Sequence, residues 1–128
     1  MSFVRSLTLS MIVLIPWPGS AAELTKDSLA TVKKNVDQKK AVLVDVREKT
    51  EWNKGHVKGA IFLPLSALQE DAKTLARRLP KDKIVYTHCV VGKRCVTAAN
   101  ILEKLGYKVR PIKPGYKELV EAGFKSEK

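Results

Sequence analysis

The sequence predicts an α/β domain in which a mostly parallel central sheet is flanked by helices on both faces. Short runs of apolar, β-branched residues alternate along the chain with segments whose apolar residues recur at helical spacing. Strands that alternate with helices favour parallel pairing, with helices covering both faces of the sheet. The 128 residues are enough for one domain of ordinary size.

The N-terminal segment, residues 1–22, has the layout of a secretory signal peptide. One basic residue precedes an apolar stretch over residues 7–15, prolines and a glycine follow, and small residues end the segment at Ala22. The apolar stretch is too short to span a bilayer alone, which takes about 20 residues. We therefore expect a signal peptide over residues 1–22, a single domain over residues 23–128, and a periplasmic or secreted protein. An uncleaved N-terminal anchor is the alternative.

The rest of the chain divides into alternating strands and helices. We expect strands at residues 41–46, 60–64, 83–88 and 108–112. We expect helices within the segments 24–36, 66–80, 95–107 and 115–124. Thr25 is the candidate N-cap of the first helix, Pro80 ends the second, and Gly106 is the candidate C-cap of the third.

Charge and composition narrow the possible partners. The chain has 24 basic and 13 acidic residues, a net charge of +11, but its lysines are scattered and form no basic run interleaved with aromatic residues. We therefore expect no nucleic-acid partner. The scattered lysines are interpreted as a solvated surface, and a positive field that attracts small anions to a cleft is the alternative. No apolar segment of membrane length follows residue 22, so we expect no membrane association once the signal peptide is removed. We also expect a monomer.

The segment after the third predicted strand has the features of a reactive thiol site. Cys89 opens this loop, at the carboxyl end of a strand, where such sheets bind ligands. Backbone N–H groups of a loop that enters a helix stabilise an anion, and here they would lower the pKa of the thiol. Gly92 permits a tight turn, while Lys93 and Arg94 add positive charge for an anionic substrate.

Three other roles for the cysteines are weighed against a nucleophile. Cys89 and Cys95, the only cysteines, could bind zinc together with His56 and His88, but their spacing matches no familiar ligand pattern. A disulfide between them fits an exported chain, although so small a loop would stabilise the fold little. A thiolate beside an arginine also suits a phosphatase. We expect no metal and no other cofactor.

Two segments resemble the signatures of the rhodanese-domain sulfurtransferases. The stretch "DVREKTEWNKGHVKGAIFLP", residues 45–64, is similar to the first signature, with matches at Asp45, Arg47, Glu51, Gly55, His56, Gly59, Ala60 and Pro64. The stretch "CVVGKR" resembles the six-residue active-site loop, with Cys89, Gly92 and Arg94 in register. The closing segment is also similar, with Gly115 in the turn after the last strand, so the resemblance covers nearly all of residues 24–124.

The resemblance implies a rhodanese-like fold and a sulfurtransferase. Cys89 would be the catalytic nucleophile, which takes sulfane sulfur from a small anionic donor such as thiosulfate as a persulfide and passes it to cyanide or a thiol. The loop that would bind the substrate consists of Val90, Val91, Gly92, Lys93, Arg94 and Cys95. Related phosphatases have a loop one residue longer, which disfavours that alternative here.

The other signature residues are expected to have structural roles. Asp45, Arg47 and Glu51 are interpreted as an ion-pair set that fixes the turn after the strand. His56 is interpreted as a hydrogen-bonded core histidine. His88 could tune Cys89 or point away from it, since strand residues alternate between faces.

The chain departs from the family pattern at Cys95, where serine or threonine is common. Cys95 is interpreted either as a buried, inert thiol that fills the serine site or as a resolving thiol that attacks a Cys89 persulfide and leaves a disulfide. A dithiol oxidoreductase is therefore one alternative function. A binding or sensing module that uses the fold without turnover is another.

Overall fold

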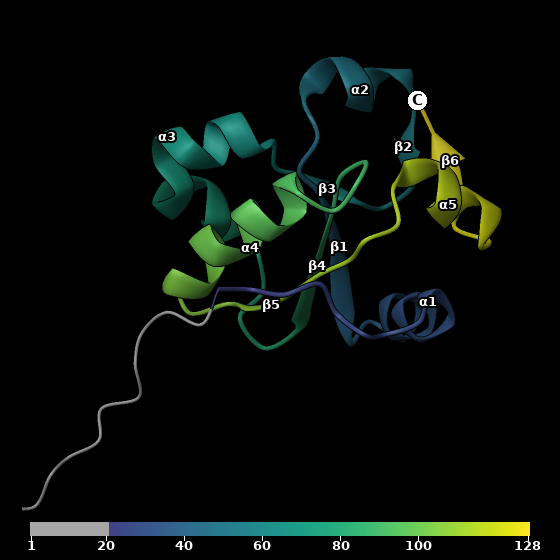
Figure 1. Cartoon of the computed structure of the whole chain (residues 1–128), viewed down its shortest axis with the longest axis horizontal. Coiled ribbons are helices and arrows are strands. Elements are labelled where there is room, and N and C mark those ends of the chain that lie inside the picture. Colours follow the sequence, from purple (N-terminus) through teal and green to yellow (C-terminus); the bar gives the residue numbers. More distant parts are fainter. Residues whose placement is uncertain (1–20) are drawn as a thin grey trace, which may run out of the picture.

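The computed structural model describes residues 21–128, so most of the predicted signal peptide lies outside the described residues. A four-stranded, fully parallel sheet forms the centre of the domain (Figure 1). Its strands, in spatial order, are β3 (Ile61–Phe62), β1 (Ala41–Asp45), β4 (Ile84–His88) and β5 (Lys108–Pro111). This confirms the predicted fold class. Among the described residues, no helix has the length and apolar character that crossing a membrane requires.

The two central strands bring the candidate site residues together. β1 pairs with β4 in a register that sets Asp45 beside His88. Both strands are almost entirely buried because helices cover both faces of the sheet, which explains their continuous apolar runs. The carboxyl ends of β1 and β4 therefore meet at one edge, directly before Cys89.

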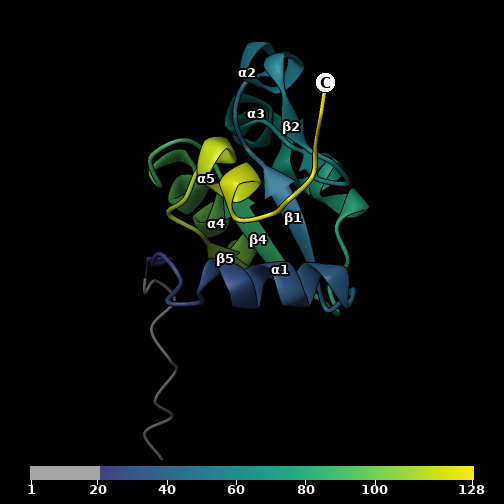
Figure 2. The same cartoon turned by 90° about the vertical axis from the view of Figure 1, so that its right-hand side faces the viewer.

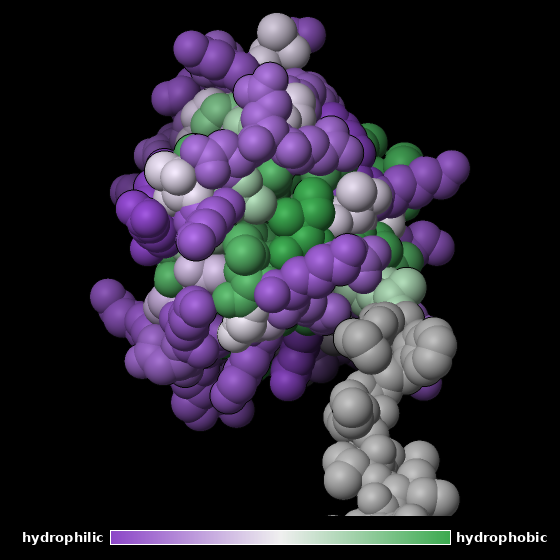
Figure 3. Space-filling view, turned by 90° about the vertical axis from the view of Figure 1, so that its left-hand side faces the viewer, coloured by the Kyte–Doolittle hydropathy of each residue, from purple (hydrophilic) through white to green (hydrophobic). Residues whose placement is uncertain are grey.

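Two helical layers enclose the sheet and make two separate cores. α3 (Leu65–Leu75) and α4 (Arg94–Lys104) pack on the face that carries Val44 and Val85. α1 (Leu29–Asp37) and α5 (Tyr116–Glu121) pack on the face that carries Leu43 and Tyr86 (Figures 1 and 2). Figure 3 looks toward the α3 and α4 side, where hydrophilic side chains surround a smaller hydrophobic area.

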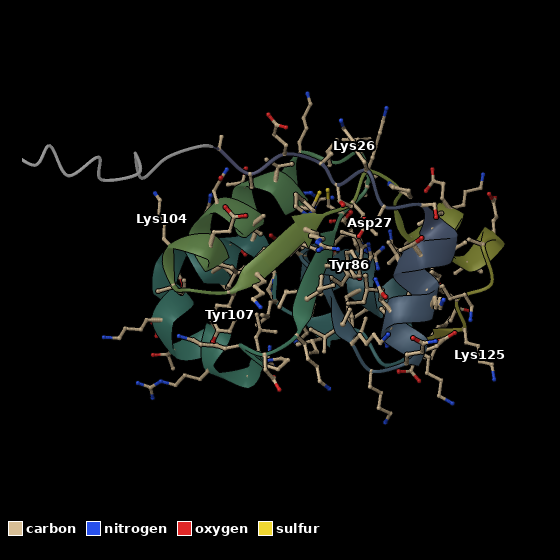
Figure 4. The ribbon with its side chains drawn as sticks, turned by 90° about the horizontal axis from the view of Figure 1, so that it is seen from below. Lys26, Asp27, Tyr86, Lys104, Tyr107 and Lys125 are labelled. Atoms are coloured by element: carbon tan, nitrogen blue, oxygen red, sulfur yellow. The ribbon has the colours of Figure 1, made fainter. Side chains whose placement is uncertain are left out.

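The first helix begins later than the sequence predicts. Its N-cap is Ser28, whose hydroxyl accepts a hydrogen bond from the Thr31 amide, so the prediction of Thr25 as the cap is wrong. The backbone N–H of Thr25 instead donates to Pro111 in β5, at 2.7 Å. The Tyr86 hydroxyl then donates to Asp27, at 2.7 Å, below the sheet (Figure 4). These two bonds hold the segment extended before the helix starts.

The structure contains several short elements that the sequence does not predict. They are α2 (Lys49–Lys54), the 3₁₀ turn Ala76–Arg78, and the antiparallel pair of β2 (His56–Val57) with β6 (Ser126–Glu127). α3 is also kinked at Asp71, whose backbone leaves the helical region (φ −150°, ψ 68°). α2 is the important addition, because it packs beside the carboxyl end of the sheet and carries Glu51.

Candidate active site

Cys89 lies at the start of the loop that joins β4 to α4, and we call residues 89–94 the Cys89 loop. The loop turns at Gly92, whose φ of +84° is unfavourable for a residue with a Cβ. The Cys89 side chain points to the α3 and α4 side of the sheet and is 1% exposed. Val90 and Val91, in contrast, are 49% and 65% exposed, so the loop presents an apolar rim to solvent above a buried sulfur.

The Cys89 sulfur lies in an environment that favours its anion. The backbone N–H of Cys95, in the first turn of α4, donates to Cys89 Sγ at 3.4 Å. The pKa of Cys89 is lowered from 9.0 to about 4, chiefly by a hydrogen bond from the Cys95 side chain. Burial opposes this shift, and backbone N–H groups of Cys95, Gly92 and Val90 add to it. Cys89 is therefore a thiolate at neutral pH.

Cys95 is the complementary, protonated partner. It is fully buried, and neither cysteine is in a disulfide. A hydrogen bond to the Cys89 sulfur raises the pKa of Cys95, and burial raises it further. Cys95 Sγ also lies 3.4 Å from the carbonyl oxygen of Ile112, a second acceptor for its single proton. At neutral pH the two cysteines therefore carry one proton between them, and this proton is bound to Cys95 Sγ.

The segment after β5 supports the Cys89 loop from behind. Gly115 lies so close to it that a Cβ at this position would come within 2.8 Å of the Val90 carbonyl oxygen and 3.0 Å of that of Cys89. Because real Cβ atoms essentially never approach backbone oxygens so closely, only glycine fits without moving the loop. The sequence prediction noted Gly115 in this turn but not its contact with the loop.

Arg94 is held by α2 and not free in the loop. Its guanidinium donates two hydrogen bonds to Glu51, at 2.6 and 3.0 Å. This interaction lowers the pKa of Glu51 to about 2 and raises that of Arg94. Glu51 was expected to join Asp45 and Arg47, and instead it ties α2 to the Cys89 loop. Lys93, by contrast, is exposed.

A buried ion pair occupies the other face of the sheet at the same edge, and we call it the Asp45 site. The Asp45 carboxylate accepts hydrogen bonds from the backbone N–H and the guanidinium of Arg47, the shortest at 2.8 Å. The guanidinium also donates to the Gly55 carbonyl oxygen, at 2.8 Å, and lies under the Tyr116 ring. This pair fixes the chain between β1 and β2.

Neither histidine side chain makes a hydrogen bond to the Cys89 sulfur. His56 is buried; its Nδ1 lies 3.1 Å from the Trp52 carbonyl oxygen and its Nε2 3.2 Å from Glu127. Its ring stacks on that of Trp52. His88 faces the Asp45 site, 3.6 Å from that carboxylate, and burial lowers its pKa. Strand alternation therefore separates His88 from its neighbour Cys89.

The described residues contain no cluster of three or more His, Cys, Asp or Glu side chains that could hold a metal ion.

A pocket of about 320 Å³ lies away from the Cys89 loop, between α1 and the turn after β2, with Lys33, Lys58 and Phe124 among its lining residues. It includes none of the predicted site residues. The chemistry that the geometry offers is therefore that of a buried thiolate, and the roles assigned to the Cys89 loop residues stay predictions.

Comparison with known families and proteins agrees with this geometry. Residues 28–122 match the family described as Rhodanese-like domain. A putative sulfur carrier protein of Bacillus subtilis, YrkF, is 30% identical over 101 residues, which are 77% of this chain and 52% of that protein. A putative mitochondrial thiosulfate sulfurtransferase of Schizosaccharomyces pombe is 33% identical over 59% of this chain and 60% of its own length.

Among solved structures, the human single-domain sulfurtransferase TSTD1 superposes with a TM-score of 0.65 at 25% identity. The match covers 80% of this chain and 97% of that one. The chain spans between about half and three fifths of the length of the curated relatives named above.

Proposed function

The chain belongs to the rhodanese-like domain family, and from that premise we propose that it is a sulfurtransferase that carries sulfane sulfur on Cys89. The observation that supports this most is the buried thiolate at the carboxyl end of β4, with a pKa of about 4. The thiolate, and not the thiol, is the nucleophile in sulfur chemistry. Relatives whose names include sulfurtransferase add support.

With thiosulfate as donor, the first half-reaction needs no proton transfer. Cys89 attacks the outer sulfur of thiosulfate, the sulfur–sulfur bond breaks, and its electron pair leaves with sulfite. Cys89 becomes a persulfide, and cyanide or an external thiolate then removes the outer sulfur and restores the thiolate. Because the thiolate already exists at neutral pH, this scheme needs no general base, which agrees with the orientation of the His88 side chain toward Asp45.

Release of sulfite tests the proposal. Thiosulfate added to the protein without any acceptor should release one sulfite for each chain, and the Cys89→Ser variant should release none. This measurement reports the first half-reaction alone, whatever happens to the sulfur afterwards. A wild-type protein that releases no sulfite with thiosulfate, and forms no persulfide with a second donor such as a persulfide thiol, would fit a binding module and overturn the proposal.

We also infer that the chain is exported, on the signal-like layout of residues 1–22. Ala22 packs against the core, and its backbone N–H donates to the Asn100 side chain, at 2.6 Å. Cleavage after Ala22 would remove this contact, whereas cleavage one residue earlier would keep it. N-terminal sequencing of protein from the native host distinguishes the two cleavage sites. An intact Met1 on a membrane-bound product would overturn the cleaved form in favour of an anchor.

A further inference from the structure

The second thiol lies directly against the nucleophile. The chain has two cysteines, and both belong to this one site. The Cys95 backbone N–H donates to Cys89 Sγ at 3.4 Å, and the Cys95 side chain contributes most to the lowered pKa of Cys89. Thr87 holds the first turn of α4 in place, because its hydroxyl donates to the Cys95 carbonyl oxygen at 2.9 Å. A hydroxyl at position 95 could supply the same hydrogen bond, but only a thiol could exchange with a persulfide.

We propose that Cys95 discharges the sulfur carried by Cys89 as hydrogen sulfide and forms a Cys89–Cys95 disulfide. This inference rests on the proposed function, because it starts from the Cys89 persulfide. It adds a reductive activity in which the chain needs no external thiol to release the sulfur.

The step balances within the protein. Cys95 Sγ forms a bond to Cys89 Sγ, and the bond from Cys89 Sγ to the outer sulfur breaks. The outer sulfur leaves with the electron pair and takes the proton of the Cys95 thiol, so it departs as hydrosulfide. The outer sulfur gains two electrons, and the two cysteine sulfurs supply one each. An external dithiol then reduces the disulfide to restore Cys89 and Cys95.

The site determines which of the two cysteines reacts first. In the resting site, the negative Cys89 sulfur holds the proton on Cys95, so Cys89 alone attacks the donor. After loading, the negative charge lies on the outer sulfur, which can serve as the base that accepts this proton. The carbonyl oxygen of Ile112, 3.4 Å from Cys95 Sγ, is the other acceptor within reach of this proton.

The fate of the sulfur in a single turnover tests the proposal. The full chain, reduced and freed of reductant under argon, is mixed with thiosulfate, and sulfite, sulfide and intact mass are measured together. The wild type should release one sulfite and one sulfide for each chain and lose the mass of two hydrogens. Cys95→Ser should release sulfite but no sulfide and should gain the mass of one sulfur. A wild-type sample without thiosulfate should keep both thiols.

The outcomes separate this inference from the proposed function. A wild type that releases sulfite, retains the extra sulfur and yields no sulfide overturns the inference and leaves the proposed function standing. A wild type that releases no sulfite and keeps its mass fails both. Where Cys95→Ser does not fold, as circular dichroism would reveal, the wild-type mass decides alone. Restoration of both thiols and of sulfite release by dithiothreitol supports the proposed cycle, and a permanently inactive product contradicts it.

Discussion

Two buried anionic groups lie at the carboxyl ends of neighbouring strands, and the protein stabilises them in different ways. Asp45 at the end of β1 accepts hydrogen bonds from a guanidinium and a backbone N–H of Arg47. Cys89 after β4 is stabilised by one thiol and several backbone N–H groups. A full counter-charge neutralises the carboxylate and occupies its lone pairs, whereas dipoles stabilise the thiolate and leave its charge available. The first arrangement suits structure and the second suits reaction.

The largest effect should come from removal of the thiolate. Cys89→Ser should lower kcat/KM for sulfur transfer by on the order of 10³-fold or more, because a serine hydroxyl does not ionise at neutral pH. The fold should persist, since Cys89 contributes little to either core beyond its own volume. Sulfite release and circular dichroism measure the two properties. Activity close to wild type in this variant would show that the thiolate does not carry the sulfur.

Disruption of the Asp45 site should instead affect stability. Asp45→Asn leaves Arg47 buried without its counter-charge, so the free energy of unfolding should fall by about 3–5 kcal/mol. The matched control is Asp37→Asn, which breaks an exposed ion pair to Lys33 and should cost less than about 1 kcal/mol. Urea denaturation compares the two variants. Equal small losses would show that the two anionic sites do not differ as their burial suggests.

Removal of the donor thiol should make Cys89 a more ordinary cysteine. In Cys95→Ala the pKa of Cys89 should rise from its value of about 4 toward 9.0, since the largest stabilising hydrogen bond is lost. A raised pKa decreases the thiolate fraction at lower pH, so sulfite release should fall at about pH 6 and recover as the pH approaches 9. The wild type should show a flat profile over this range.

The ultraviolet absorbance of the thiolate follows the same titration without turnover. Cys95→Ser keeps a donor and should lie between the wild type and Cys95→Ala. If the three proteins titrate alike, the backbone N–H groups alone set the pKa of Cys89, and the Cys95 side chain plays no part in it.

The smallest effect should come from the exposed cation of the Cys89 loop. Lys93→Ala should lower kcat/KM for thiosulfate about two- to fivefold, because an exposed charge acts through screened attraction. The loss should shrink as salt is added and should be absent with a neutral donor. Lys104→Ala, at the far end of α4, is the matched control. Equal losses with both donors would mean that Lys93 shapes the loop.

The sequence predicts the sheet well because each of its central strands is a continuous apolar run. β1 and β4 are buried on both faces, and burial of that kind leaves a clear pattern. α2 and the β2–β6 pair leave no such pattern, since six and two residues are too few to show a period. The first helix starts late because Asp27 bonds to Tyr86, a contact between residues 59 positions apart.

The site is predicted less completely than the sheet, for a related reason. The Cys89 loop is recognisable because its residues are contiguous. The ion pair of Arg94 with Glu51 joins residues 43 positions apart, and charge alone does not say which acid an arginine meets. The contact of Cys95 with Ile112 likewise depends on how β5 packs against β4. Pairings of this kind follow from the tertiary structure and leave no local signal.

The close approach of Gly115 to the Cys89 loop links reactivity to the order in which the chain is made. The carbonyl oxygens of Cys89 and Val90 pack against Gly115, and Cys95 Sγ lies within hydrogen-bond distance of the carbonyl oxygen of Ile112. A nascent chain that ends after α4 contains the groups that lower the pKa of Cys89, but it lacks the two contacts that hold the Cys89 loop and the Cys95 thiol in place. The Cys89 loop therefore reaches its final geometry only when the segment around Ile112 and Gly115 has folded against it.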